Sequence, residues 1–279
     1  MGFAFRIVNV FTVGDDRFSG NPLCVFEDAR GLDDGQMLAL ARQFNLSETT
    51  FVLPSDRADA RVRIFTPGFE MPFAGHPTLG TASVVAAGRE RVTLEMKAGL
   101  VPVARKGDRW TLRTARGPES RPVEASREEL AKMLGLETSA IAGDPRWVTT
   151  GVEQLVIPIA SSEAVEKARP SPDLLFRWGF SKARDEAMAY LWAADGPEWT
   201  VRFFFTSHGA VIEDPATGSA CANLGGYLLE TGYPLPVSAT LRQGDAVGRP
   251  SRLHLDVDAE RSIFVGGSVI ELGRGVIEL

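Results

Sequence analysis

The chain is poor in cysteine, and its two cysteines are isolated. Cys24 and Cys221 lie far apart among 279 residues, and neither belongs to a CxxC pair or stands near a cluster of histidines. A disulfide framework or a structural zinc site needs paired or clustered ligands, so the sequence predicts neither. The expectation that follows is a reducing, cytoplasmic location.

Blocks of one charge are also missing. Asp and Glu number 36 against 30 Lys and Arg, which gives a net charge of −6 and a pI near 5.3. Proteins that bind nucleic acids carry a concentrated basic surface, so no nucleic-acid partner is expected. The content of 44% hydrophobic and 24% charged residues is typical of a globular protein, and the length allows one large domain or two smaller ones.

No hydrophobic run is long enough to cross a membrane. The longest uncharged stretch, residues 71–88, is interrupted by Pro72, Pro77 and several glycines, whereas a spanning helix needs about 20 apolar residues. The N-terminal segment, residues 1–11, resembles a strand and lacks the apolar core of a signal peptide. We therefore expect a soluble protein without a membrane partner.

Short apolar runs separated by Gly, Pro and Asp dominate the sequence, and this pattern is typical of β-strands. Among them, Met37, Leu40, Ala41 and Phe44 recur with the period of one helical face, which predicts a helix ending near Asn45. Helices and strands do not alternate as in a parallel sheet, so we predict an α+β fold. Strands are predicted at 5–11, 22–26, 50–53, 62–65, 92–96, 110–112, 155–159, 188–192, 201–205 and 253–257.

A domain boundary is predicted near residue 118. The sequence from Arg113 to Pro122 is polar and contains Gly and Pro. After it, Ser126 and Glu129 have the spacing of a capping box, which predicts a short helix ending near Gly135. The second lobe is therefore expected to begin at residue 119.

The two halves share a repeated pattern. Val-Arg-Ile-Phe-Thr at 62–66 returns as Val-Arg-Phe-Phe-Phe-Thr at 201–206, and each is followed about ten residues later by a turn rich in proline and glycine, at 72–78 and 214–220. A duplicated pair of lobes explains this repeat. Related lobes commonly enclose a ligand-binding cleft between them.

Both turns are predicted to begin a helix and to bind an anion. Gly75 and Gly218 let the backbone approach a ligand closely, and Pro77 is tolerated in a first helical turn. The first N–H groups of a helix have no partner within it and lie at the positive end of its dipole. A small anionic substrate is therefore expected. A single such turn more often only starts a helix, and His76 and Asp214 taken alone would be a packed histidine and a turn residue.

Five sequence blocks together resemble the PhzF-like family of phenazine-biosynthesis isomerases. They follow the family's order from about residue 5 to about residue 270, so the resemblance covers nearly the whole chain. The blocks are GNPL at 20–23, NLSETTFV at 45–52, PFAGHPTLGTA at 72–82, EDPATGSA at 213–220, and QG at 243–244 with GRPS at 248–251.

The resemblance implies the diaminopimelate epimerase-like fold, with two pseudo-symmetric lobes that are each a β-barrel around a central helix. Residues 1–118 and 266–279 would form the N-terminal lobe, because the last strand of such folds returns to complete it. Residues 119–265 would form the C-terminal lobe. The resemblance further implies a homodimer.

By the same resemblance, Glu48 is the catalytic acid and base, with His76 and Asp214 as its catalytic partners. The best-known family activity is isomerisation of trans-2,3-dihydro-3-hydroxyanthranilate, in which one carboxylate moves a proton between two ring carbons. Partial burial ahead of the apolar run at 50–53 would favour the protonated form that this chemistry needs. No cofactor and no metal are implied. The substrate-binding residues would be Asn21, Gly75, Thr217, Gly218 and Ser219.

Four alternatives belong to other classes. Epimerases and racemases of this fold use two cysteines, but by resemblance of the turns Ala74 and Ala216 occupy those positions, and alanine carries no proton. A hydrolase built on Ser219 would lack the GxSxG elbow, and the three histidines, including His208 and His254, have no metal-ligand spacing. A binding protein of the same fold is the fourth alternative. Glu153, which precedes a strand in the second half, is interpreted as structural.

Overall fold

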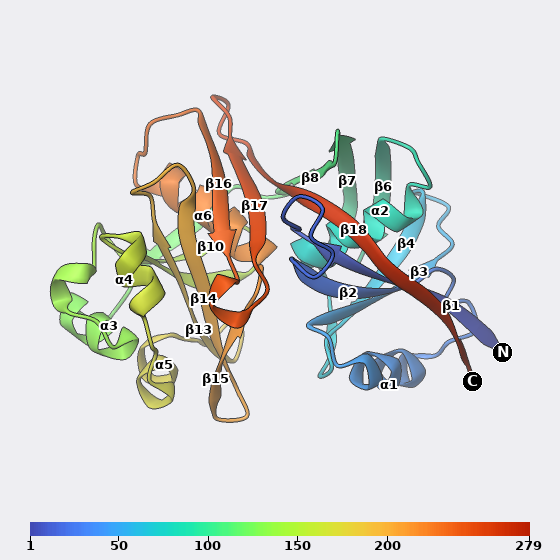
Figure 1. Cartoon of the computed structure of the whole chain (residues 1–279), viewed down its shortest axis with the longest axis horizontal. Coiled ribbons are helices and arrows are strands. Elements are labelled where there is room, and N and C mark those ends of the chain that lie inside the picture. Colours follow the sequence, from blue (N-terminus) through green and yellow to red (C-terminus); the bar gives the residue numbers. More distant parts are fainter. The chain divides into compact units, whose positions relative to one another are not determined.

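The structure, a computed structural model, describes all 279 residues. Contacts divide the chain into an N-terminal unit, Met1–Arg113 with Gly266–Leu279, and a C-terminal unit, Thr114–Val265. Strands and helices are combined in both units (Figure 1), so the predicted α+β class is confirmed. No helix is long and apolar enough to cross a lipid bilayer.

The N-terminal unit is a closed β-barrel. Its strands pair in the circular order β1–β2–β3–β4–β6–β7–β8–β18, and β5 extends a hairpin from β4. The C-terminal strand β18 runs antiparallel to β1 and thereby completes this barrel. The bounds are β1 Gly2–Val10, β2 Asn21–Phe26, β3 Glu48–Leu53, β4 Ala60–Phe65, β5 Glu70–Met71, β6 Arg91–Met96, β7 Gly99–Lys106, β8 Arg109–Arg113 and β18 Ile263–Glu278.

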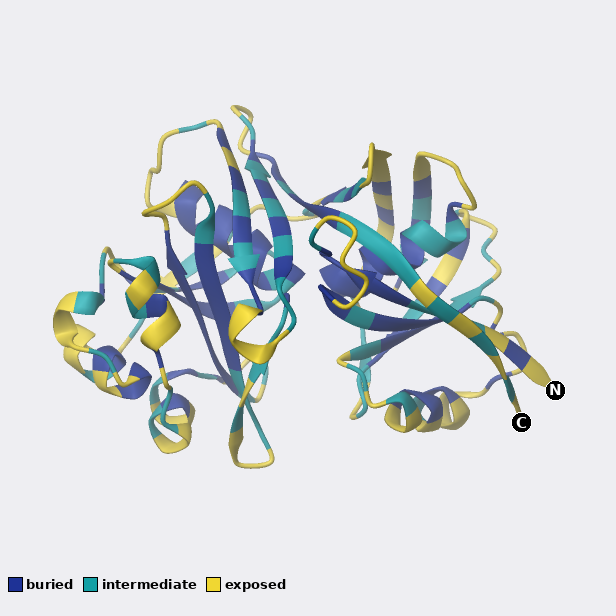
Figure 2. Cartoon of the chain, viewed as in Figure 1, coloured by how far each residue is buried: buried dark blue, intermediate teal, exposed yellow.

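Helix α2 (Gly75–Val85) lies inside this barrel. It contacts strands β1, β2, β3, β6 and β8, and every residue from Gly75 to Ala82 is buried (Figure 2). A helix surrounded by strands has no polar face, and small residues let it approach them closely. A Cβ at Gly80, for example, would lie 2.6 Å from Cδ2 of Leu23. This tight packing fixes the start of α2 relative to β2 and β3.

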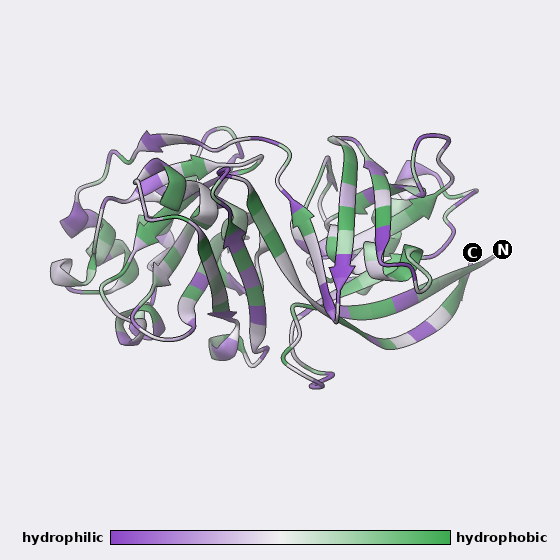
Figure 3. Ribbon diagram, turned by 90° about the horizontal axis from the view of Figure 1, so that it is seen from above, coloured by the Kyte–Doolittle hydropathy of each residue, from purple (hydrophilic) through white to green (hydrophobic).

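Helix α1 (Asp34–Phe44) packs on the outside of the barrel. Asp33 and Gln36 form a capping box at its start, and Asn45 ends it in the left-handed conformation. The predicted helix and its end are therefore confirmed. Its apolar face joins a cluster that includes Phe26 and Phe51 from β2 and β3. These strands are buried on both faces, whereas β6 and β7 alternate between buried and exposed residues, seen as purple and green stripes in Figure 3.

The C-terminal unit repeats this plan. Its strands pair in the order β9–β10–β11–β13–β14–β16–β17 and curve around the buried helix α6 (Gly218–Glu230). Two hairpin strands, β12 and β15, extend from β13 and β14. The bounds are β9 Glu119–Pro122, β10 Arg146–Thr149, β11 Glu153–Pro158, β12 Phe180–Ser181, β13 Glu186–Ala193, β14 Trp199–Ser207, β15 Ala210–Asp214, β16 Val237–Gln243 and β17 Ser251–Val257.

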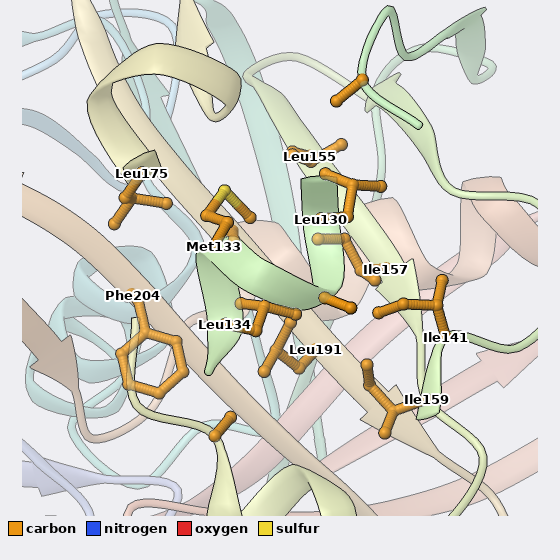
Figure 4. Packing of buried hydrophobic residues seen from close by; sticks show 14 of the residues in the cluster. Leu130, Met133, Leu134, Ile141, Leu155, Ile157, Ile159, Leu175, Leu191 and Phe204 are labelled. Atoms are coloured by element: carbon orange, nitrogen blue, oxygen red, sulfur yellow. The ribbon is translucent and has the colours of Figure 1, made fainter. Parts of the chain in front are cut away.

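Three further helices cover the other face of the C-terminal sheet: α3 (Arg127–Leu134), α4 (Ser162–Lys167) and α5 (Pro172–Trp178). The predicted capping box of Ser126 and Glu129 starts α3, and Gly135 ends it. Leu130 and Leu134 of α3 pack with Leu155, Leu191 and other strand residues in the core of Figure 4. Strands β11 and β13 are therefore buried on both faces and read as continuous apolar runs. Two 3₁₀ turns, Thr138–Ala140 and Asp245–Val247, complete the unit.

Candidate active site

The N-terminal unit brings Glu48, His76 and Asn21 together. Glu48 is the first residue of β3 and lies opposite Leu23 in the parallel pairing with β2, the strand that begins at Asn21. His76 is the second residue of α2. A buried hydrogen bond of 2.8 Å between the hydroxyl groups of Thr50 and Thr81 joins β3 to α2. The three site residues are therefore fixed by the barrel and its central helix.

Both ring nitrogens of His76 are occupied. Nδ1 lies 3.0 Å from Oε2 of Glu48, and Nε2 lies 3.2 Å from the backbone carbonyl oxygen of Asn21. The imidazole is buried, with 5% of the side chain exposed, whereas 17% of the Glu48 side chain is exposed. Oε2 is the Glu48 oxygen in this contact, and Oε1 takes no part in it.

The carbonyl of Asn21 favours one tautomer of His76. A carbonyl oxygen only accepts hydrogen bonds, so Nε2 of His76 must carry a hydrogen. The Nδ1 contact with Glu48 then needs one proton between the two groups, held either by a neutral glutamic acid or by an imidazolium beside a carboxylate. A hydrogen bond at this contact therefore requires one proton between Glu48 and His76.

Neither central helix has a side-chain cap at its N-terminus. Helices α1, α3 and α4 are capped by the side chains of Asp33, Ser126 and Ser161, whereas α2, α6 and the surface helix α5 have no such cap. The first intrahelical bonds are donated by the N–H groups of Thr78 and Cys221. The preceding N–H groups have no partner in the helix, and such groups bind anions. They belong to Gly75, His76, Gly218, Ser219 and Ala220.

The C-terminal unit brings Asp214, Thr217 and Gln243 together. Oε1 of Gln243 accepts a hydrogen bond from the backbone N–H of Thr217, so its Nε2 is a donor, to the carbonyl of Asp214 (2.9 Å) and to the hydroxyl of Thr217 (3.0 Å). That hydroxyl in turn donates to Oδ2 of Asp214 at 2.5 Å. The carboxylate of Asp214 is therefore held as an acceptor, suited to an amine or hydroxyl group.

A glycine makes this arrangement possible. Gly244 follows Gln243 and has a positive φ of 81°, and a Cβ there would lie 2.5 Å from the carbonyl oxygen of Pro215. Any side chain would therefore separate the end of β16 from the turn that begins α6. Ser219, the second residue of α6, accepts a hydrogen bond of 3.0 Å from Nε2 of Gln154 on β11.

The side chains that the alternative reactions would use are buried or already hydrogen-bonded. Cys24 and Cys221 are fully buried, and burial strongly raises the pKa of both thiols. The hydroxyl of Ser219 accepts a hydrogen bond from the amide of Gln154, and both ring nitrogens of His76 are bonded within the N-terminal unit. No three His, Cys, Asp or Glu side chains are arranged to hold a metal ion. Glu153 is bonded to Arg121 and to the hydroxyl of Ser181, and the Arg121 hydrogen bond lowers the pKa of its carboxyl group.

The family model of phenazine biosynthesis-like proteins matches residues 8–272. The chain belongs to this family. An uncharacterised isomerase of Pasteurella multocida is 41% identical over 278 residues, covering 98% of this chain and 93% of the relative. The trans-2,3-dihydro-3-hydroxyanthranilate isomerase of Pseudomonas aeruginosa is 35% identical over 261 residues, covering 89% of each chain.

The fold of this PhzF-like chain also occurs in a crystal structure of a PhzF-family protein from Bacillus anthracis. The TM-score is 0.85 over the full length of both chains at 24% identity, so this likeness concerns the fold alone. The predicted α+β fold of the diaminopimelate epimerase-like type is thereby confirmed, with a closed barrel around α2 in the N-terminal unit and a curved sheet around α6 in the C-terminal unit. With relatives at 33–41% identity named as isomerases, the PhzF-like protein is an enzyme of the isomerase class.

Two polar residues of the C-terminal unit, Gln154 and Asn223, lie outside the sequence motifs. Gln154 and Asn223 are buried polar residues that bond to each other at 2.8 Å although 69 positions separate them. The only signal in the sequence is that Gln154 interrupts an apolar strand run, and this signal does not identify Asn223 as its partner. The motif at 243–244 was recognised, but the contacts of Gln243 with Thr217 and Asp214 come only from the structure.

Proposed function

We propose that this protein is a cofactor-independent isomerase that moves a proton within a small carboxylate substrate, with Glu48 as the acid and base. The observation that carries the proposal is the hydrogen bonding of His76, which leaves one proton shared with Glu48 and leaves Oε1 of Glu48 for the substrate. A carboxylate in this state can both remove and return a proton.

The proposed reaction conserves atoms and charge. In the imidazolium–carboxylate form, Oε1 of Glu48 takes a proton from a substrate carbon next to a double bond. The electron pair of that C–H bond forms a new double bond, and the original one shifts to leave a second carbon electron-rich. Glu48 then returns the proton to this second carbon. His76 keeps its own proton throughout and stabilises the negative charge of Glu48 before the transfer.

The remaining site groups are proposed to hold the substrate. The uncapped N–H groups at the starts of α2 and α6 suit a carboxylate, and the acceptor oxygen atoms of Asp214 suit an amine or hydroxyl. The relative from Pseudomonas aeruginosa is named for trans-2,3-dihydro-3-hydroxyanthranilate, which carries all three groups. We therefore propose this compound, or a close relative of it, as the substrate class.

The test is conversion followed by NMR in deuterated buffer. The wild-type protein would be given trans-2,3-dihydro-3-hydroxyanthranilate and a panel of β-hydroxy and α,β-unsaturated amino acids. The expected result is a moved double bond in at least one compound, with deuterium on the carbon that receives the proton, and without added metal or cofactor. Absence of both conversion and exchange across the panel would contradict the proposed substrate class.

A further inference from the structure

Four polar groups, two of them buried, form a directed chain of hydrogen bonds in the C-terminal unit. It starts at the backbone N–H of Thr150, which donates to Oδ1 of Asn223 at 2.8 Å. Nδ2 of Asn223 donates to Oε1 of Gln154 at 2.8 Å, and Nε2 of Gln154 donates to the hydroxyl oxygen of Ser219 at 3.0 Å. Gln154 and Asn223 are almost completely buried, with 1% and 0% of the residue exposed.

The direction of this chain follows from its backbone ends. The N–H of Thr150 can only donate, so the Asn223 atom that it meets must be the oxygen. The carbonyl of Val152 can only accept, and it lies 2.7 Å from the other Asn223 side-chain atom, which must be the nitrogen. Gln154 must then turn its oxygen toward Asn223 and its NH₂ group toward Ser219. Neither amide can be flipped without placing like groups against each other.

The chain ends on a hydroxyl group at the start of α6. Because Gln154 donates to Ser219, the hydroxyl oxygen is used as an acceptor and its hydrogen must point elsewhere. Ser219 is partly exposed and makes no other side-chain hydrogen bond. Its backbone N–H is one of the uncapped groups of the same helical turn. One lone pair of the Ser219 oxygen is used by Gln154, so the hydroxyl hydrogen is directed away from Gln154 and adds a donor to the uncapped N–H groups of this turn.

We infer that Gln154 is a positioning residue that fixes Ser219 as a hydrogen-bond donor, so that the start of α6 selects a carboxylate over the corresponding amide. This inference rests on the proposed function, since it concerns the same substrate carboxylate. A carboxylate can accept from these donors with both of its oxygen atoms, whereas an amide has one acceptor oxygen and an NH₂ group that would face the backbone N–H donors. Sites with directed polar groups discriminate strongly against such mismatches.

Binding of a matched pair of probes tests this role. Anthranilate and 2-aminobenzamide differ only in carboxylate against amide, and calorimetry measures their affinities without turnover. The wild type should prefer anthranilate. Ser219→Ala should weaken anthranilate binding about tenfold, as expected for one hydrogen bond to a charged group. Gln154→Met should weaken it about fivefold, because the hydroxyl loses its fixed direction, and should change 2-aminobenzamide binding by less than twofold.

The double variant separates positioning from packing. If Gln154 acts through Ser219, adding Gln154→Met to Ser219→Ala should change anthranilate affinity by less than twofold. An equal loss in both backgrounds, or no loss in either, would overturn the inference. Glu153→Gln, on the same strand but bonded to Arg121 and Ser181, is the control and should bind as the wild type does.

Neutron diffraction from the wild-type protein gives an answer that depends on neither folding of a variant nor the proposed function. The expected map has deuterium on the Gln154 nitrogen directed at the Ser219 oxygen, and the Ser219 deuterium directed away from Gln154. A Ser219 deuterium directed at Gln154 would overturn the inference. Failure of the wild type to bind anthranilate would instead count against the proposed function.

Discussion

At the scale of single residues, neighbouring donors and acceptors determine which hydrogen bonds His76 and Asp214 can form. His76 meets a carbonyl oxygen on one side and a carboxylate on the other, so a backbone group that cannot titrate favours the tautomer with hydrogen on Nε2. Asp214 meets a hydroxyl that is itself turned by Gln243. In both cases a neighbour with a fixed role determines what the reactive group offers to a ligand.

The cysteines allow a prediction at the same scale. Burial raises the pKa of the Cys24 and Cys221 thiols far above neutrality, so neither forms a thiolate at pH 8. The double variant with alanine at both positions should keep its isomerase rate within about twofold, and native wild-type protein should not react with Ellman's reagent until it is unfolded. A rate loss above a hundredfold in the double variant would indicate thiol chemistry.

At the scale of elements, the uncapped starts of α2 and α6 contrast with the capped starts of α1, α3 and α4. Ala74 occupies the N-cap position of α2, where a serine, threonine, aspartate or asparagine is usual. A helix inside a barrel is held by packing, so α2 does not depend on a cap. Its N–H groups are therefore left available for a ligand.

Ala74→Ser tests whether stability and binding oppose each other at this position. The new hydroxyl should accept a hydrogen bond from the N–H of His76 and stabilise the protein by up to about 1 kcal/mol, while competing with a substrate carboxylate for that N–H. Thermal unfolding and anthranilate calorimetry should therefore change in opposite directions. Tighter anthranilate binding in the variant would contradict a role of this N–H in carboxylate binding.

The two hairpins that precede the central helices carry the same ion pair. Arg63 meets Glu70 on the β4–β5 hairpin, and Arg202 meets Glu213 on the β14–β15 hairpin, each through Nε and one terminal nitrogen to the two carboxylate oxygens. Each guanidinium also lies over a phenylalanine ring, at 5.1 and 4.6 Å from its centroid. The pairs hold the strands that lead into the turns at 72–78 and 214–220.

Burial predicts different energies for these pairs. Arg202 and Glu213 are both 8% exposed, whereas Arg63 is 20% exposed and has a second partner in Asp34. Glu213→Gln leaves a buried guanidinium without its counter-charge and should lower the free energy of unfolding by about 3–5 kcal/mol. Glu70→Gln should lower it by about 1–2 kcal/mol. Urea unfolding measures both, and equal losses would contradict the comparison.

Elements with local signals were predictable from the sequence, and those with only distant partners were not. The end of α1 at Asn45, the capping box of α3 and the starts of the central helices at Gly75 and Gly218 depend on neighbouring residues. Strand β15 (Ala210–Asp214) was not predicted, and its last residue, Asp214, was assigned to the turn at 214–220. The parallel pairs, such as β2 with β3, depend on contacts that no local pattern encodes.

The candidate site shows the same division. Glu48, His76 and Asp214 stand in recognisable blocks, and the role of each stays a prediction until it is tested. The hydrogen bond between Gln154 and Asn223 could not be predicted, because it joins β11 to the middle of α6 across 69 positions. A glutamine inside the apolar run of β11 is informative only when the residue packed against it is known.

At the scale of the whole molecule, the last strand, β18, closes the barrel of the N-terminal unit. Strand β18 begins in the C-terminal unit and then pairs with β1 from Val10↔Val269 to Gly2↔Glu278. Without it the barrel of the N-terminal unit would have two open edges, at β1 and β8. That barrel can therefore be completed only after almost the entire chain is present.

Truncation tests this dependence. Removal of residues 268–279 should abolish cooperative unfolding of the N-terminal unit and promote association through the exposed edges, as measured by calorimetry and size-exclusion chromatography. Removal of Leu279 alone, which follows β18, is the control and should change little. A truncated protein with two-state unfolding and unchanged size would contradict the account.

The most direct measurement compares Glu48→Gln with Glu153→Gln. Each glutamate is the first residue of a strand, β3 or β11, but only Glu48 is proposed to transfer a proton. With trans-2,3-dihydro-3-hydroxyanthranilate in deuterated buffer, we predict that Glu48→Gln loses at least about a thousandfold in conversion and incorporates no deuterium, while Glu153→Gln stays within about threefold of the wild type. Conversion by Glu48→Gln at the wild-type rate would contradict the central claim.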